Sequence, residues 1–276
     1  MQEGVVKLLG DAGIRLTYDR RGYRPTLSMP ELEAKILKPQ NIVEMLHVGS
    51  RDLGFAGADW VAELGAELTE VLDLGLNPVR LVAAAPEDLL IDGKLPDQPL
   101  VIASEYTRLT KQWIKEQNLD AKFVRAYGAT EVFPPEDADC IVDNTATGST
   151  LAANQLEIVD TLMHSSTRLY AHPAALDVPA KRSAIEDLKL VLESVLEARK
   201  RVMLELNVPR EKLDEIVESI AIGQQWEDDV RVVLFVRLAE GVELTEALVK
   251  EIRTTIRANT TPRHVPASPR RHVAAR

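Results

Sequence analysis

The most constraining feature of this sequence is a short apolar run followed by a turn of small residues, at positions 139–156. Residues 140–142 (Cys-Ile-Val) are typical of a buried strand, which we expect to end at Asp143. Residues 151–156 favour a helix, because they contain two leucines and two alanines. The segment therefore predicts a strand, a tight turn and the start of a helix.

A turn of this kind is suited to binding an anion. Backbone N–H groups at a helix N-terminus are unpaired, and the helix dipole adds about half a positive charge there. A glycine in the turn lets the backbone approach a phosphate, and neighbouring hydroxyls can donate further hydrogen bonds. The loop residues are Thr145, Ala146, Thr147, Gly148, Ser149 and Thr150. The alternative is an ordinary turn in which serine and threonine cap the helix.

Asp143 stands at the predicted carboxyl end of the strand, immediately before this turn. Its carboxylate is suited to accepting hydrogen bonds from sugar hydroxyls or to holding a magnesium ion. We therefore predict Asp143 as a catalytic residue and as the one protein ligand to Mg²⁺.

Composition narrows the class of protein. The chain has 276 residues, 45% of them hydrophobic, which suffices for one two-lobed domain or two small ones. A net charge of -10 argues against nucleic-acid binding, which needs clustered cations. The single cysteine, Cys140, excludes an internal disulfide and is expected to be an inert, packed thiol. No segment is apolar enough for a membrane span and no signal peptide opens the chain, so we expect a cytoplasmic protein.

An acidic residue followed by a threonine-glycine-hydroxyl-threonine loop resembles the 5-phosphoribosyl 1-diphosphate (PRPP) loop of phosphoribosyltransferases. With residues 128–131 upstream and 151–156 downstream, the string resembles ATP phosphoribosyltransferase, the first enzyme of histidine biosynthesis. Further segments similar to the long form of that family lie at 36–41, 49–63, 102–107 and 198–209.

The resemblance implies an α/β fold with a two-lobed, periplasmic-binding-protein-like body. Lobe I is expected at residues 1–86 and 158–220, and lobe II, with the PRPP loop, at residues 87–157. In the family a first strand and a basic turn precede the helix predicted at the N-terminus, so the body is expected to be N-terminally truncated. The order of elements in lobe II predicts a parallel sheet with the loop at a strand's carboxyl end.

The implied reaction transfers the 5-phosphoribosyl group of PRPP to N1 of ATP and releases diphosphate. It implies ATP and PRPP as substrates, Mg²⁺ as the cofactor and a homo-oligomeric enzyme without nucleic-acid or membrane partners. The alternative is a catalytically inactive, two-lobed phosphate- or nucleotide-binding relic, or a chimeric gene product.

The resemblance also assigns residues outside the loop. Glu131 is implied to face the substrate as a catalytic residue, its alternative role being that of a helix-dipole partner. Glu105 and Tyr106 are implied to lie beside the nucleotide. Lys38 is the candidate cation for the diphosphate, with an ordinary surface lysine as the alternative.

Residues 49–63 predict the rim of a binding cleft. Gly57 ends a short strand at 53–56 and allows close approach of a ligand. Asp59 is placed to cap the following helix. Both residues are predicted to contribute to nucleotide binding.

Several further elements are expected from pattern alone. The N-terminal residues form a helix that Gly13 ends, and Asn41 caps a helix after a strand that Pro39 stops. A long amphipathic helix begins at Ser183, with Glu186 completing a capping box, and extends to Leu206. Further strands are predicted at 79–85, 100–103, 123–126, 158–162 and 168–171.

The last part of the chain differs in character. Residues 221–267 resemble the C-terminal lobe of acetoacetate-CoA ligase, although that family's catalytic lysine lies beyond the end of the match. A β-branched strand is expected at 230–238, and the basic tail 268–276 matches neither family. We interpret the chain as a chimera, with a divergent regulatory module as the alternative.

Overall fold

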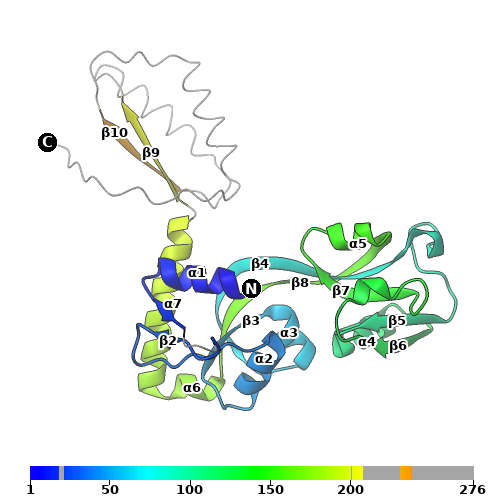
Figure 1. The fold of residues 1–276 in the computed structure, drawn as a ribbon, viewed down its shortest axis with the longest axis horizontal. Helices are drawn as coiled ribbons and strands as arrows, with labels where there is room; N and C mark the ends of the chain where they lie inside the picture. The colour runs from blue at the N-terminus through cyan, green and yellow to red at the C-terminus, as the bar shows by residue number, and fades with distance from the viewer. Residues whose placement is uncertain (19–21, 200, 208–230, 238–276) are drawn as a thin grey trace. The chain divides into compact units, whose positions relative to one another are not determined.

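The structure is a computed structural model that describes residues 1–18, 22–199, 201–207 and 231–237. The chain divides into two compact units, Met1–Glu197 and Ala198–Arg276. The first unit is an α/β body built on a single six-stranded sheet and a separate short hairpin (Figure 1). The α/β class predicted from the sequence is confirmed.

The six-stranded sheet is mixed, with the strand order β3-β8-β4-β7-β5-β6. Its strands are β3 (Leu53–Gly57), β4 (Thr69–Pro86), β5 (Leu100–Ser104), β6 (Ala121–Arg125), β7 (Cys140–Thr145) and β8 (Leu156–Ala171). β5 pairs in parallel with β6 and β7. β4 is antiparallel to both β7 and β8, and β3 is antiparallel to β8. The parallel sheet predicted for lobe II is thus present in β5–β7.

The two longest strands connect two groups of elements in Figure 1, with α1, α2, α3, α6 and α7 near one end and α4 and α5 near the other. β4 has 18 residues and β8 has 16. The two separate strands predicted at 158–162 and 168–171 are wrong, because β8 is continuous. Register shifts in the β4–β8 ladder accommodate the intervening polar residues without ending either strand. The predicted boundaries between lobes stay a prediction.

Seven α-helices surround the sheet among the described residues. They are α1 (Gln2–Asp11), α2 (Pro39–His47), α3 (Ala58–Leu64), α4 (Thr107–Glu116), α5 (Ser149–Ala153), α6 (Pro173–Asp177) and α7 (Pro179–Arg199). Short 3₁₀ turns lie at Glu87–Leu89 and Thr130–Val132. β1 (Leu16–Thr17) and β2 (Thr26–Leu27) form the hairpin. As predicted, Gly13 follows α1 with a φ of +79°.

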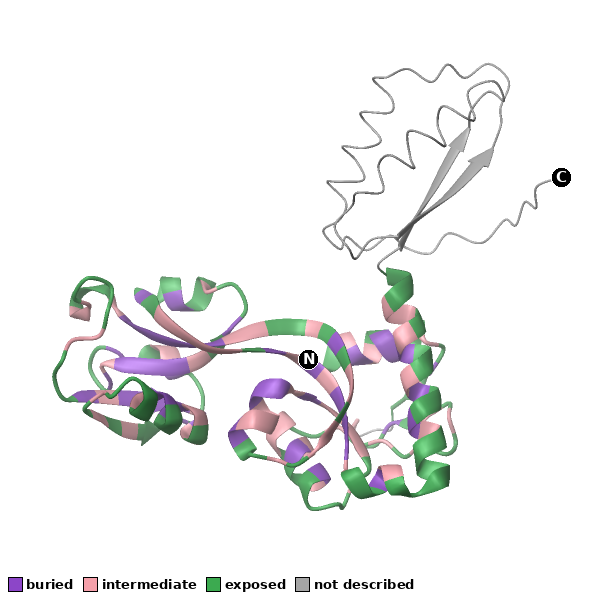
Figure 2. Ribbon diagram, turned by 180° about the vertical axis from the view of Figure 1, so that it is seen from behind, coloured by how far each residue is buried: buried purple, intermediate pink, exposed green. Residues whose placement is uncertain are grey.

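Alternation along the central strands fills both faces of the sheet with aliphatic side chains. Leu81 and Ala83 of β4 lie on one face with Cys140 and Val142 of β7, and all four are buried. The intervening residues of the same strands belong to a separate cluster that includes Leu151 of α5. Buried positions are concentrated in these strands (Figure 2). The run 140–142 is therefore a strand buried on both sides, as predicted. The predicted end of this strand at Asp143 is wrong, because β7 continues to Thr145. The predicted helix at 151–156 is also too long, because α5 ends at Ala153 and Leu156 begins β8.

Three predicted helix boundaries are wrong. α7 begins at Pro179, so Ser183 lies within the helix and cannot be its N-cap. The same helix ends at Arg199 and the chain continues as the strand β9 (Arg201–Asn207), because β-branched and hydrophobic residues there suit a strand equally well. α2 begins at Pro39 after an extended Lys38, so no strand precedes it and Asn41 lies inside the first turn.

The second unit contributes β9 and β10 (Arg231–Arg237), which pair in parallel. β10 confirms the strand predicted at 230–238. The remaining predictions for 221–267, and those for the tail 268–276, lie outside the described residues. Among the residues that are described, no helix is long and apolar enough to cross a membrane.

Burial of Cys140 leads to a chemical prediction. The side chain is completely buried in β7, and this burial raises the pKa of the thiol to about 12. We expect Ellman's reagent at pH 8 to leave the native protein almost unmodified and to label one thiol after denaturation. Rapid labelling of the native protein would contradict this placement of β7.

Candidate active site

The predicted phosphate loop connects the end of β7 to the start of α5. The N–H of Gly148 donates to Thr145 Oγ1 at 2.9 Å, so a buried threonine anchors the turn. Thr147 Oγ1 donates to Ser149 Oγ at 2.9 Å and accepts from the Ser149 N–H at 3.3 Å. Thr147, Ser149 and Thr150 are exposed. The loop is therefore ordered by its own hydroxyls and still presents hydroxyl groups to solvent.

Gly148 is required by backbone conformation and not by lack of space. Its φ is +81°, in the left-handed region that residues with a Cβ rarely adopt. A Cβ there would meet only Ile158 Cδ1, at an ordinary contact distance of 3.8 Å. The sequence prediction that this glycine lets the backbone approach a phosphate stays a prediction.

Asp143 is followed by the last two residues of β7, and the charges of Glu131 and Glu105 act on its carboxylate. The pKa of Asp143 is raised to about 6, mainly by burial and to a smaller extent by these two charges. Hydrogen bonds from the Asn144 N–H, at 2.7 Å, and from the Thr130 side chain act in the opposite direction. The fold thus brings together three carboxylates that the sequence assigned separately.

These three carboxylates are hard oxygen donors of the kind that Mg²⁺ prefers. In the part of the chain that is described, no group of three or more acidic, histidine or cysteine side chains is arranged to hold a metal ion by itself. Mg²⁺ commonly binds through one or two carboxylates together with substrate phosphates. Asp143 therefore fits a magnesium ion that arrives with a phosphorylated substrate.

Asp59 and Tyr106 are predicted nucleotide-binding residues that the structure places in the interior. The Tyr106 hydroxyl donates to Asp59 Oδ2 at 2.6 Å, and Ser165 Oγ donates to Asp59 Oδ1 at 2.7 Å. Tyr106 is completely buried and Asp59 is 5% exposed. Asp59 is the second residue of α3 and Gly57 is the N-cap, so the predicted capping role of Asp59 is wrong. Their contact with nucleotide stays a prediction.

Gly57 and Lys38 occupy different settings. A Cβ on Gly57 would collide with the Asp59 carboxylate, which folds back over the start of α3. Lys38 is exposed at the N-terminus of α2, and its side chain forms no hydrogen bond or ion pair with any described residue. No contact brings Lys38 to the phosphate loop within the described chain, so its role also stays a prediction.

Three residues beside the loop received no role from the sequence. Thr130 is buried against Asp143, and Asn144 Nδ2 donates to the Tyr106 hydroxyl at 2.9 Å. Arg80 of β4 is directly paired with Thr145 in the β4–β7 ladder, which places a cation next to the loop. Only the strand register reveals Arg80, since it lies 65 positions before Thr145.

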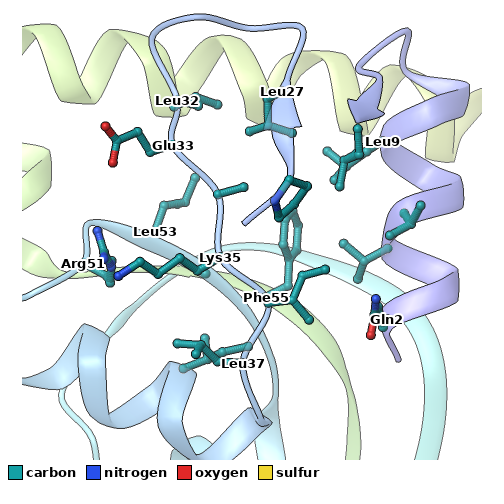
Figure 3. A pocket seen from close by; sticks show the side chains of 18 of the residues that line it. Gln2, Leu9, Leu27, Leu32, Glu33, Lys35, Leu37, Arg51, Leu53 and Phe55 are labelled. Atoms are coloured by element: carbon teal, nitrogen blue, oxygen red, sulfur yellow. The ribbon is translucent and has the colours of Figure 1, made fainter. Parts of the chain in front are cut away.

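An apolar cavity of about 250 Å³ lies apart from these residues. Figure 3 shows it between α1, the hairpin, β3 and the extended chain around Lys35. Its wall includes Leu9, Leu27, Leu53 and Phe55, and none of the predicted site residues. The cavity is thus distinct from the candidate active site.

The raised pKa of Asp143 predicts a pH-dependent effect on stability. Above about pH 6 the folded protein carries a disfavoured charge, whereas near pH 4 the carboxyl is largely neutral in the folded state. Asp143→Asn should therefore stabilise the protein by about 1–2 kcal/mol at pH 8, with a gain that shrinks towards pH 4. Thermal denaturation of the variant and the wild type at the two pH values measures this.

The matched control is Asp97→Asn, the same replacement at an exposed loop position. It should change the free energy of unfolding little at either pH, because an exposed carboxylate stays solvated. An Asp143→Asn variant that is less stable than the wild type at pH 8 would contradict the placement of this carboxylate.

Comparison with known proteins agrees with this arrangement. A family profile described as HisG, ATP phosphoribosyltransferase, matches residues 38–194. The ATP phosphoribosyltransferase of Chlorobium phaeovibrioides is 36% identical over 230 residues, covering 82% of this chain and 78% of the relative. That of Pelotomaculum thermopropionicum is 38% identical over 230 residues, covering 82% and 80%.

A solved structure has the same fold. It is the ATP phosphoribosyl transferase (HisG:HisZ) complex from Thermotoga maritima, of which one chain aligns with a TM-score of 0.63 at 24% identity. The alignment covers 71% of this chain and 94% of that chain. That likeness shows the fold, and the family profile together with the two relatives shows that this chain belongs to the ATP phosphoribosyltransferase family.

Proposed function

We propose that this protein is an ATP phosphoribosyltransferase that transfers the 5-phosphoribosyl group of PRPP to N1 of ATP and releases diphosphate. The observation that carries the proposal is the ordered turn at 145–150, which begins two residues after Asp143, where the strand β7 ends. A hydroxyl-lined turn beside a carboxylate matches a sugar phosphate, which offers an anion at one end and hydroxyls along its ring.

In this proposal the loop binds the 5-phosphate. The hydroxyls of Thr147, Ser149 and Thr150 are exposed and can donate to phosphate oxygens. Asp143 accepts hydrogen bonds from the ribose hydroxyls, which requires its ionised form. Burial of that carboxylate strengthens such bonds, because the surrounding dielectric is low.

The diphosphate requires positive charge that the carboxylates around Asp143 do not supply. Mg²⁺ bound by Asp143 and the substrate would neutralise the leaving diphosphate. Arg80, paired with Thr145, lies beside the loop and can add a fixed cation. Lys38 is the second candidate cation, by resemblance to the family.

The chemical step needs no nucleophile from the protein. The bond between the anomeric carbon and the diphosphate oxygen breaks, and the electron pair of adenine N1 forms the new bond to that carbon. The ring carbon becomes positively charged as the diphosphate leaves, so nearby carboxylates favour this transition state. The contribution of the protein is alignment and charge stabilisation. By resemblance to the family, Glu131 faces the substrate and Glu105 lies beside the nucleotide.

We further propose a cytoplasmic enzyme that assembles as a homo-oligomer, as expected for the pathway that the family serves. An inactive two-lobed relic would bind PRPP without turnover. Release of diphosphate from ATP and PRPP, followed with a coupled pyrophosphatase assay in the presence of Mg²⁺, separates the two. We expect turnover that requires both substrates, and binding without turnover would contradict the proposed reaction.

The phosphate loop can be tested by removing one hydroxyl. Thr150→Val keeps the shape of the side chain but removes a donor to the 5-phosphate, so the KM for PRPP should rise roughly tenfold. The KM for ATP should change little. Steady-state kinetics with each substrate varied in turn measures both constants.

The matched control is Thr17→Val, the same replacement on an exposed strand of the hairpin. It should leave both KM values unchanged. Equal PRPP constants for Thr150→Val and Thr17→Val would remove the Thr150 hydroxyl from phosphate binding.

A further inference from the structure

A hydrogen-bond chain connects the interior of the protein to the strand end that carries Asp143. Tyr106, which lies one residue beyond Glu105 after β5, donates its hydroxyl proton to Asp59 Oδ2 at 2.6 Å. The hydroxyl oxygen of Tyr106 in turn accepts from Asn144 Nδ2 at 2.9 Å. Asn144 lies between Asp143 and Thr145 on β7, so this contact reaches the residues next to the loop.

The Tyr106 side chain is held from several directions. Its ring stacks on Trp60 with centroids 4.7 Å apart, and its backbone N–H donates to Ser104 Oγ at 2.9 Å. Asp59 is fixed in turn by Ser165, whose hydroxyl donates to the carboxylate and accepts from the Asp59 N–H at 3.0 Å. The hydroxyl that Asn144 meets is therefore a fixed point in a packed interior.

The direction of the hydrogen bonds is also fixed. Burial, followed by the charge of Asp59, raises the pKa of Tyr106 far above its usual range. The phenol thus keeps its proton, donates it to Asp59 in a hydrogen bond and leaves its lone pairs for Asn144. The side-chain amide of Asn144 thus donates to the Tyr106 hydroxyl, and its backbone N–H donates to Asp143 Oδ1 at 2.7 Å.

We propose that Tyr106 and Asn144 are positioning residues, which hold the carboxylate of Asp143 and the start of the phosphate loop in the geometry that PRPP requires. This inference rests on the proposed function and gives Tyr106 a role other than direct nucleotide contact. The Tyr106 hydroxyl is buried, and its hydrogen-bond partners are the side chains of Asp59 and Asn144. It therefore acts on Asp143 and the loop through Asn144. Small misplacements of reacting groups can cost about a hundredfold in rate.

The first test removes each contact singly and then both together. Tyr106→Phe keeps the ring and its stacking but loses the hydroxyl. Asn144→Ala, at an exposed position, loses the side-chain amide that donates to that hydroxyl. Each should lower kcat/KM for PRPP roughly tenfold or more. Tyr106→Phe also removes the bond to Asp59, but both variants remove the Tyr106–Asn144 bond, so the double variant should lose less than the sum of the two single losses. Additive losses would overturn the proposal.

The two Michaelis constants give a readout that loss of stability would not move. Asn144 adjoins Asp143 and the start of the phosphate loop, so both variants should raise the KM for PRPP and leave the KM for ATP unchanged. The matched control is Tyr170→Phe, another tyrosine with little exposure, on β8. It should leave kcat/KM for PRPP and both KM values unchanged.

Hydrogen exchange followed by mass spectrometry tests the same inference without turnover. Amides of residues 143–150 should exchange faster in Tyr106→Phe and Asn144→Ala than in the wild type or Tyr170→Phe. If exchange is faster in the two variants but the wild type shows no turnover, the proposed reaction is refuted and the positioning role is supported. An active wild type with unchanged exchange and kinetics in both variants would refute the positioning role and leave the reaction standing. If Tyr106→Phe does not fold, Asn144→Ala alone decides these outcomes.

Discussion

The placement of β7 between β4 and β5 is the constraint on which the site depends. β5 pairs with β7 only from Cys140 to Val142, whereas β4 pairs with it as far as Thr145. The end of β7 therefore extends beyond its β5 partner and meets the residues that follow β5. This offset brings Glu105 and Tyr106 next to Asp143 and Asn144, and it lets one polar cluster form at the edge of an aliphatic core.

The charges around this strand end account for the kind of ligand it suits. Three carboxylates alone would repel a phosphorylated substrate, yet the turn beside them presents hydroxyls and a left-handed glycine. An anion fits the turn, whereas sugar hydroxyls and a hydrated cation fit the carboxylates. PRPP, the substrate proposed for this chain, has an anion and sugar hydroxyls in one molecule, and its diphosphate can bind a hydrated cation.

Local signals in the sequence were sufficient for the buried core of β7, the position of the turn and the burial of Cys140, since apolar continuity and a glycine act over a few residues. They did not give the end of β7, which lies two residues beyond Asp143. Long-range features were beyond such signals. The burial of Asp59 depends on Ser165, 106 positions away, and the proximity of Arg80 depends on strand register. Ser183 has the composition of a cap but lies inside α7, because Pro179 starts the helix earlier. Tertiary packing decided the first two outcomes, whereas a proline four residues away decided the third.

The most direct measurement is a crystal structure of the full chain soaked with PRPP and Mg²⁺. The account predicts the 5-phosphate within hydrogen-bonding distance of the Thr147, Ser149 and Thr150 hydroxyls, with the ribose hydroxyls on Asp143. A 5-phosphate bound elsewhere, with this turn contacting only solvent, would contradict it.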